Sequence, residues 1–164
     1  MKSLFLIRHA KSSWEDPSLK DFDRPLNPRG LRDAPFMSKL LKGKGIVVDQ
    51  IISSPANRAL STAKYFAEAF GINNKKIILR NEIYEAYPED VMAIVKELPN
   101  EVDVALIFGH NPTFTSLANQ FGGYLSNVPT CGVVRIDAEI DKWADFSIDT
   151  AQRTAFHYPK QYFS

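Results

Sequence analysis

Short runs of apolar residues alternate along this chain with longer segments whose apolar positions recur every three or four residues. The short runs predict buried strands, and the longer segments predict amphipathic helices. Strands are expected at residues 2–7, 50–52, 77–79 and 102–108, and helices at residues 30–41, 56–70, 88–98 and 111–121. Pro35 is expected in the first turn of its helix, where a missing N–H is tolerated. This alternation favours a mostly parallel central sheet with helices on both faces, which is a three-layer α/β sandwich.

The last part of the chain follows a different pattern. Residues 132–136 and 143–148 are two further apolar runs, and the polar residues 139–141 between them predict an antiparallel pair of strands. Residues 151–164 are expected to form an aromatic C-terminal tail, containing His157, that packs over the sheet edge. No repeat or linker interrupts the 164 residues, so residues 1–164 are predicted to form a single domain.

Composition and charge narrow the range of partners. The net charge is +1 and the basic residues are scattered, which argues against binding to nucleic acid or to an anionic membrane. A single cysteine, Cys131, excludes an internal disulfide and every metal motif with several cysteines. The apolar run before Arg8 is too short for a signal peptide, and no segment could span a bilayer. We therefore expect a cytoplasmic protein without a membrane or nucleic-acid partner.

Three of the predicted strands stop at residues that suit an anion. Arg8 and His9 follow the first strand, Arg58 follows the strand at 50–52, and His110 follows the strand at 102–108. The carboxyl ends of parallel strands meet at one edge of a sheet, where ligands bind in α/β proteins. Two imidazoles and two guanidinium groups are therefore predicted to converge on one anion.

These residue types favour phosphoryl transfer. A histidine is mostly neutral near pH 7, so its imidazole is a nucleophile that needs no separate base. Guanidinium forks bind the oxygens of a phosphoryl group bidentately. The three histidines, His9, His110 and His157, lack the spacing of a metal site, so neither a metal nor another cofactor is expected.

The same residues belong to an ordered set of motifs that covers residue 2 to about residue 136. The motifs are Arg8-His9-Ala10-Lys11-Ser12-Ser13-Trp14, Asp23-Arg24-Pro25-Leu26-Asn27-Pro28-Arg29-Gly30, Ser53-Ser54-Pro55-Ala56-Asn57-Arg58-Ala59, Ile83-Tyr84-Glu85-Ala86 and Gly109-His110-Asn111-Pro112. This set resembles the SixA-type branch of the histidine phosphatase, or phosphoglycerate mutase-like, superfamily. The resemblance implies a three-layer α/β fold, transient phosphorylation of His9, and a phosphate pocket completed by Arg8, Arg58 and His110. Ala10 stands where the superfamily has glycine, and alanine disfavours a positive φ there.

The resemblance also suggests a proton donor. In mutase-like relatives an acidic residue after the third strand protonates the leaving group, and Glu85 matches that position, with Glu82 as the second candidate. A carboxyl group that acts as an acid must be kept protonated by burial. A phosphohistidine substrate relaxes this requirement, because an imidazole that is protonated on its other nitrogen already leaves well.

Two residues are candidates for binding the substrate. Arg24 follows a loop that could fold over the site, and its similarity to the family's Arg-Pro-Leu element suggests a contact with phosphate or substrate. The alternative for Arg24 is a salt bridge to Asp21 or Asp23. Ser12, just after His9, could supply an additional donor.

We expect a phosphatase that works through phospho-His9, and a protein phosphohistidine phosphatase is the first choice. The short stretch from Arg80 to Tyr87 leaves little chain for a capping insertion, so the site should be open to a histidine on another protein. The first alternative is a small-molecule phosphomonoesterase acting on a sugar phosphate or a similar metabolite. The second is a non-catalytic module that binds a phosphorylated ligand. The sequence does not indicate an oligomeric state.

Overall fold

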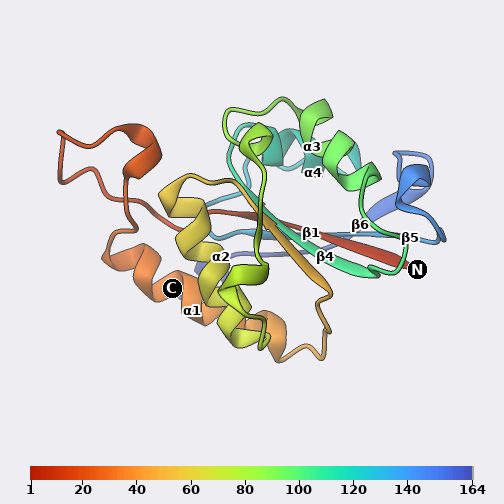
Figure 1. Cartoon of the computed structure of the whole chain (residues 1–164), viewed down its shortest axis with the longest axis horizontal. Helices are drawn as coiled ribbons and strands as arrows, with labels where there is room; N and C mark the ends of the chain where they lie inside the picture. The colour runs from red at the N-terminus through yellow and green to blue at the C-terminus, as the bar shows by residue number, and fades with distance from the viewer. Residues whose placement is uncertain (164) are drawn as a thin grey trace.

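A six-stranded sheet forms the centre of the computed structural model, which describes residues 1–163 (Figure 1). Its strands are β1 (Lys2–Arg8), β2 (Gln50–Ser53), β3 (Ile78–Leu79), β4 (Val104–Gly109), β5 (Val133–Ala138) and β6 (Ala151–His157). The strand order is β3-β2-β4-β1-β5-β6. The pairs β3–β2, β2–β4 and β4–β1 are parallel, whereas β5 and β6 are antiparallel additions at one edge. The prediction of a mostly parallel sheet is confirmed.

Helices cover both faces of this sheet. The pair α1 (Pro28–Lys42) and α2 (Asn57–Ala69) lies on one face, and the pair α3 (Pro88–Lys96) and α4 (Thr113–Gln120) lies on the other (Figure 1). Successive side chains of a strand point to opposite faces. Phe5 and Ile7 of β1 accordingly pack in the core under α1 and α2, while Leu4 and Leu6 pack in the core under α3 and α4. The predicted three-layer sandwich is confirmed.

The strand register brings three chain segments to one edge of the sheet. Arg8 at the end of β1 pairs with Gly109 at the end of β4, and Ser53 at the end of β2 pairs with Phe108. The segments that follow these strands therefore lie next to one another. The segment after β1 projects beyond the sheet and carries a short 3₁₀ helix, Asp21–Asp23 (Figure 1).

The first helix begins earlier than the sequence pattern predicts. The Asn27 side chain caps it by accepting a hydrogen bond of 2.9 Å from the Gly30 N–H, and Pro28 occupies the first turn. Pro35 consequently lies inside α1 rather than in its first turn. The predicted start at Gly30 was wrong because Asn27-Pro28 is itself the stronger start signal.

The predicted strand at residues 143–148 was also wrong. Residues Trp143–Asp145 form a 3₁₀ helix, and both Trp143 and Phe146 are fully buried in the core under α3 and α4. Two residues three positions apart face opposite sides of a strand, so a strand could not bury both side chains in one core. A turn of helix can do so.

The strand that completes the antiparallel pair is β6, which lies in the segment predicted to be a tail. Residues 151–157 pair with β5 in a register that places His157 opposite Val133. Residues 158–163 follow this strand as a tail, and residue 164 lies outside the described residues. The ring centres of Tyr162 and Phe163 lie 5.6 and 4.6 Å from the ring centre of Phe36 on α1. No helix of the described residues is long and apolar enough to cross a membrane.

Candidate active site

A cavity of about 240 Å³ opens at the carboxyl edge of the sheet, where β1, β2 and β4 end. The structure brings together in its walls four of the predicted catalytic residues and both predicted substrate-binding residues. The lining consists of Arg8, His9, Lys11, Ser12, Trp14, Arg24, Arg58, His110, Asn111 and Thr130. Glu85, the fifth predicted catalytic residue, does not line this cavity.

His9 is held with one ring nitrogen available. Its Nδ1 lies 2.7 Å from the carbonyl oxygen of Ala10. A carbonyl can only accept, so Nδ1 carries the proton and Nε2 keeps a free electron pair. Burial lowers the pKa of His9 to about 3, and the nearby charges of Arg58 and Arg8 act in the same direction. The ring is therefore neutral and nucleophilic at any physiological pH.

His110 faces His9 with a ring-centroid separation of 5.2 Å. Its Nε2 lies 2.8 Å from the hydroxyl oxygen of Ser54, and that oxygen already accepts a hydrogen bond from the Ala56 N–H. Among the described residues the Ser54 hydroxyl proton has no other acceptor, so the hydroxyl donates its hydrogen bond to Nε2 of His110. The proton of the neutral His110 ring is therefore on Nδ1. Burial, followed by the charge of Arg58, lowers the pKa of His110 to about 4.

Three polar atoms around the cavity are buried without a partner. They are Arg8 Nε, Arg58 Nε and His110 Nδ1, three of the four such side-chain atoms among residues 1–163. An unsatisfied buried donor costs about 1–3 kcal/mol. One bound anion with several oxygens would satisfy all three together. Arg8 is oriented by a hydrogen bond of 3.1 Å from Nη1 to the carbonyl oxygen of Val128, and burial lowers its pKa.

Asp21, from the loop that follows β1, binds Arg58 through the two Nη atoms of the guanidinium group, on the side away from Nε. Arg58 Nη1 donates to the Asp21 carbonyl oxygen at 2.7 Å, and Nη2 donates to the Asp21 carboxylate at 3.0 Å. The Tyr84 hydroxyl donates to the same carboxylate oxygen at 2.7 Å. Partial burial acts to raise the pKa of Asp21, but hydrogen bonds from Tyr84 and Arg58 lower it to about 2. Asp21 is thus a permanent carboxylate that leaves the Nε edge of Arg58 for an anion.

Arg24 lies in the cavity wall and makes one of the alternative contacts expected for it. Its guanidinium group forms a salt bridge of 3.2 Å with Asp21 and donates a hydrogen bond of 2.8 Å to the Ser12 hydroxyl. It also stacks 3.5 Å from the ring centre of Trp14, whose side chain is otherwise exposed. Arg24 is therefore a cation of the cavity with fixed partners, and Ser12 helps to orient it.

Glu85 lies outside this cavity, in the loop between β3 and α3. Its side chain is exposed, and its φ of 58° is in the left-handed region. It lines a neighbouring groove of about 540 Å³ that also contains His110 and Asn111. The burial expected of a proton donor is thus absent at Glu85. Glu82, the second candidate, is ion-paired with Arg80 at 2.6 Å and lines neither space.

Close backbone packing supports the segment that carries His9. The Ala10 N–H donates to the Thr62 hydroxyl at 2.9 Å, and the positive φ values of non-glycine residues within 1–163 fall only at Glu85 and Cys131. Alanine therefore fits the position where the superfamily has glycine. Gly30 packs so closely that a Cβ there would lie 2.2 Å from the Lys11 carbonyl oxygen.

Sequence reasoning did not identify Ser54, Tyr84 or Thr130 as parts of the site, and treated Asp21 only as a salt-bridge partner of Arg24. Ser54 and Tyr84 lie inside the motifs at residues 53–59 and 83–86, and their place in these motifs is the signal that could have identified them. Thr130, which lines the cavity and accepts a hydrogen bond from Arg29 at 3.3 Å, lies in no such motif.

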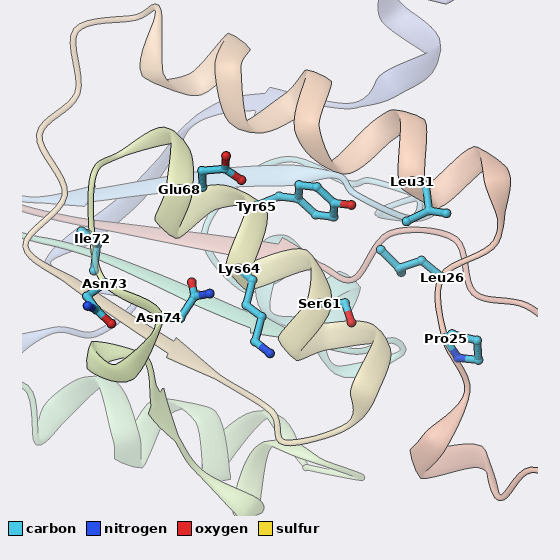
Figure 2. Close-up of a pocket in the computed structure, with 10 residues that line it drawn as sticks. All are labelled: Pro25, Leu26, Leu31, Ser61, Lys64, Tyr65, Glu68, Ile72, Asn73 and Asn74. Atoms are coloured by element: carbon cyan, nitrogen blue, oxygen red, sulfur yellow. The ribbon is translucent and has the colours of Figure 1, made fainter.

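A larger cavity, about 750 Å³, is a different space (Figure 2). It lies between α1, α2 and the residues around Asn73, and its titratable lining residues are Lys64, Tyr65 and Glu68. None of the predicted site residues lines it. Within residues 1–163, no three His, Cys, Asp or Glu side chains are grouped as a metal site requires.

The fold and the smaller cavity define an α/β protein with a cationic pocket and a neutral, nucleophilic histidine at the carboxyl edge of its sheet. The chain belongs to the histidine phosphatase superfamily (branch 1), whose family model matches residues 4–97.

Comparison with individual proteins agrees with this family. The crystal structure of a SixA protein from Agrobacterium tumefaciens has a TM-score of 0.80 and 29% identity, and the match covers 96% of this chain and 98% of that one. The protein histidine phosphatase SixA in complex with tungstate has a TM-score of 0.82 at 18% identity, covering 97% and 98% of the two chains. An uncharacterized protein of Mycobacterium leprae is 28% identical over 94% of this chain and its own full length. The resemblance to the SixA-type branch is confirmed.

Proposed function

We propose that this protein is a protein phosphohistidine phosphatase that works through a phosphohistidine intermediate on His9. The observation that carries the proposal is the set of three unpartnered donors, Arg8 Nε, Arg58 Nε and His110 Nδ1, in the cavity that holds a neutral His9. At about 240 Å³ this cavity is smaller than pockets that enclose a whole small molecule, which begin at about 300 Å³. It suits a phosphoryl group whose leaving group stays outside.

The proposed reaction has two steps. In the first, Nε2 of His9 attacks phosphorus, the bond to the leaving group breaks, and its electron pair goes to the leaving group. The two arginines and His110 stabilise the charge that spreads over the phosphoryl oxygens. In the second step, water attacks phospho-His9, the electron pair of the P–N bond returns to Nε2, and phosphate departs. No metal is needed to neutralise the phosphoryl group, because the arginines do so.

A phosphorylated histidine on another protein fits the surroundings of the cavity. Eight residues, 80–87, join β3 to α3, and they include only one turn of 3₁₀ helix, so this connection adds no inserted cap over the site. Two similar structures are SixA proteins, and one was solved with tungstate, an anion that resembles phosphate. A cytoplasmic location, and the absence of nucleic-acid and membrane partners, stay predictions.

The main alternative is a phosphomonoesterase that acts on a metabolite. A phosphoserine phosphatase of Entamoeba histolytica has the same fold, with a TM-score of 0.66 at 16% identity. The same residues would perform the reaction, but a metabolite leaves as an alkoxide, which needs a proton donor. The exposed position of Glu85 favours the phosphohistidine substrate.

The test compares kcat/KM on a phosphohistidine-bearing protein with kcat/KM on a panel of phosphorylated metabolites. The His9→Ala variant is the control, and it should fold but lose turnover on every substrate. A strong preference for phosphohistidine would support the proposal. A preference for one metabolite would replace the substrate and keep the mechanism. Phosphate binding without hydrolysis of any substrate would favour the non-catalytic module.

A further inference from the structure

A groove adjoins the phosphoryl cavity on the side of α3 and α4. It has a volume of about 540 Å³ and is lined by residues 85–88 and 110–113 together with Ser116. His110 and Asn111 line both spaces. A group bonded to a phosphorus atom in the cavity can therefore extend into this groove, which we call the leaving-group groove.

The chemistry of the leaving-group groove differs from that of the cavity. The cavity is lined by three arginines and Lys11, whereas the described lining of the groove contains no arginine or lysine. Its single carboxylate is Glu85, and its aromatic and proline side chains are Tyr87, Pro88 and Pro112. Such a groove repels a leaving group that carries a second phosphate or a carboxylate. It suits a flat ring with an N–H donor or a positive charge.

The backbone presents Glu85 at this point. Its φ of 58° is unfavourable for a residue with a side chain, and such conformations concentrate at functional sites. The neighbouring residue Tyr84 is tied to Asp21 by its hydroxyl, and the Tyr87 N–H donates to the Asp90 carboxylate at 2.9 Å. The loop is thus fixed on both sides of Glu85, with its exposed carboxylate at the groove.

We propose that the leaving-group groove receives the imidazole of the substrate phosphohistidine and that the Glu85 carboxylate accepts a hydrogen bond from the ring nitrogen that does not carry phosphorus. This inference rests on the proposed function and reverses the expectation that Glu85 donates a proton. The charge of the groove and its continuity with the phosphoryl cavity are the two observations that favour an imidazole as its occupant.

The hydrogen bond matters because of how the P–N bond breaks. When His9 attacks, the electron pair of that bond returns to the substrate nitrogen. If the distal nitrogen holds a proton, the ring leaves as neutral imidazole and no proton has to be transferred. If it does not, the ring must leave as an imidazolate, which is a poor leaving group. A carboxylate at the distal N–H keeps the proton in place, since a nearby negative charge favours the protonated ring.

The pH profile of the reaction reports this contact. The titratable groups around Glu85 are His110 in the groove, Tyr84 and Tyr87 on its own loop, and Asp90 at the start of α3. The pKa of His110 is about 4, and burial and the contact with Asp21 raise the pKa of Tyr84. Neither of these two groups changes charge between about pH 6 and about pH 9, where the substrate ring loses its proton.

The experiment measures kcat/KM from about pH 6 to about pH 9 on a phosphohistidine-bearing protein and on p-nitrophenyl phosphate. The proteins are the wild type, Glu85→Gln, Glu85→Asp and the control Glu82→Gln, which alters an exposed carboxylate outside the groove. Glu85→Gln should lower kcat/KM on phosphohistidine about tenfold at the alkaline end and shift the alkaline limb down by about one pH unit. The loss should be small near pH 6 and absent on p-nitrophenyl phosphate, and Glu85→Asp should restore part of it.

An equal loss on both substrates at every pH would overturn the inference, because it indicates a structural role. Unchanged hydrolysis of phosphohistidine by Glu85→Gln would overturn it while leaving the proposed function intact. A larger loss on p-nitrophenyl phosphate than on phosphohistidine would overturn it as well. If the wild type hydrolysed p-nitrophenyl phosphate but not phosphohistidine, the proposed function itself would fall, and the inference with it.

Discussion

The two buried histidines should make the protein unstable in mild acid. In the folded chain the pKa of His9 is about 3 and that of His110 is about 4, because burial and the neighbouring arginines disfavour their protonated forms. In the unfolded chain both imidazoles have a pKa near 6.5. The unfolded state therefore binds more protons below pH 6.5. The stabilisation is complete above that pH and is lost progressively as the pH falls toward 4 and then 3.

The size of the loss follows from these pKa values. Lowering the pH from about 7.5 to about 4.5 should cost about 2–3 kcal/mol for each histidine, or about 5 kcal/mol together. A domain of this kind is stable by only about 5–15 kcal/mol, so a third or more of the free energy of unfolding is at stake. Asp21 contributes little in this window, since its pKa of about 2 affects stability mainly below pH 4.

Urea unfolding at the two pH values measures this loss, in buffers without phosphate or sulfate, which would fill the site. His9→Asn should reduce the difference between the two pH values by about 2–3 kcal/mol, whatever it does to stability at pH 7.5. His157→Asn is the matched control: that ring is half-buried at the end of β6, and the variant should keep most of the loss. A His9→Asn protein with the same acid loss as the wild type would refute the reasoning that His9 is buried and neutral.

Three further results are expected. Arg58→Ala should remove at least ~3 kcal/mol of transition-state stabilisation, measured as kcat/KM, because it deletes one donor of a preorganised set; an effect under tenfold would place Arg58 outside the catalytic machinery. Gly30→Ala should lower both urea stability, by about 1–3 kcal/mol, and kcat/KM, because its Cβ would lie 2.2 Å from the Lys11 carbonyl oxygen beside the His9 segment. Unchanged stability and activity would show that the backbone at Lys11 can move away from a Cβ at position 30 without cost. Added chelator should leave the rate unchanged, and inhibition that added metal reverses would contradict a mechanism based on arginine alone.

Most of the sheet could be predicted because the signal is local. The strand at 102–108 is apolar on both faces, and its observed form, β4, packs Ala105 and Ile107 on one side and Leu106 and Phe108 on the other. The prediction of a strand at 143–148 was wrong because a buried turn of helix, which contains Trp143 and is followed by Phe146, is as apolar in sequence as a buried strand. A short apolar run does not distinguish these two forms when tertiary packing decides between them.

The candidate site divides in the same way. His9, Arg58 and His110 could be placed together because each follows a strand end, and parallel strands bring their carboxyl ends to one edge. The role of Asp21 could not be predicted, because its contacts depend on how the loop after β1 folds back. Asp21 is 37 residues from Arg58 and 63 from Tyr84, and no periodic pattern relates residues in loops.

The contacts of Asp21 explain how the site can hold three arginines close together. Asp21 binds Arg58 through the Nη edge and forms a salt bridge with Arg24, so one carboxylate offsets part of the repulsion between these cations before any substrate arrives. Arg58 Nε remains unpartnered, and an incoming phosphoryl group therefore does not have to displace Asp21. The donors are already in place when the charge of the transition state develops, which is the condition under which electrostatic stabilisation is largest. Burial keeps His9 unprotonated, and the charges of Arg58 and Arg8 act in the same direction, so two of the cations that bind the phosphoryl group also help to preserve the nucleophile.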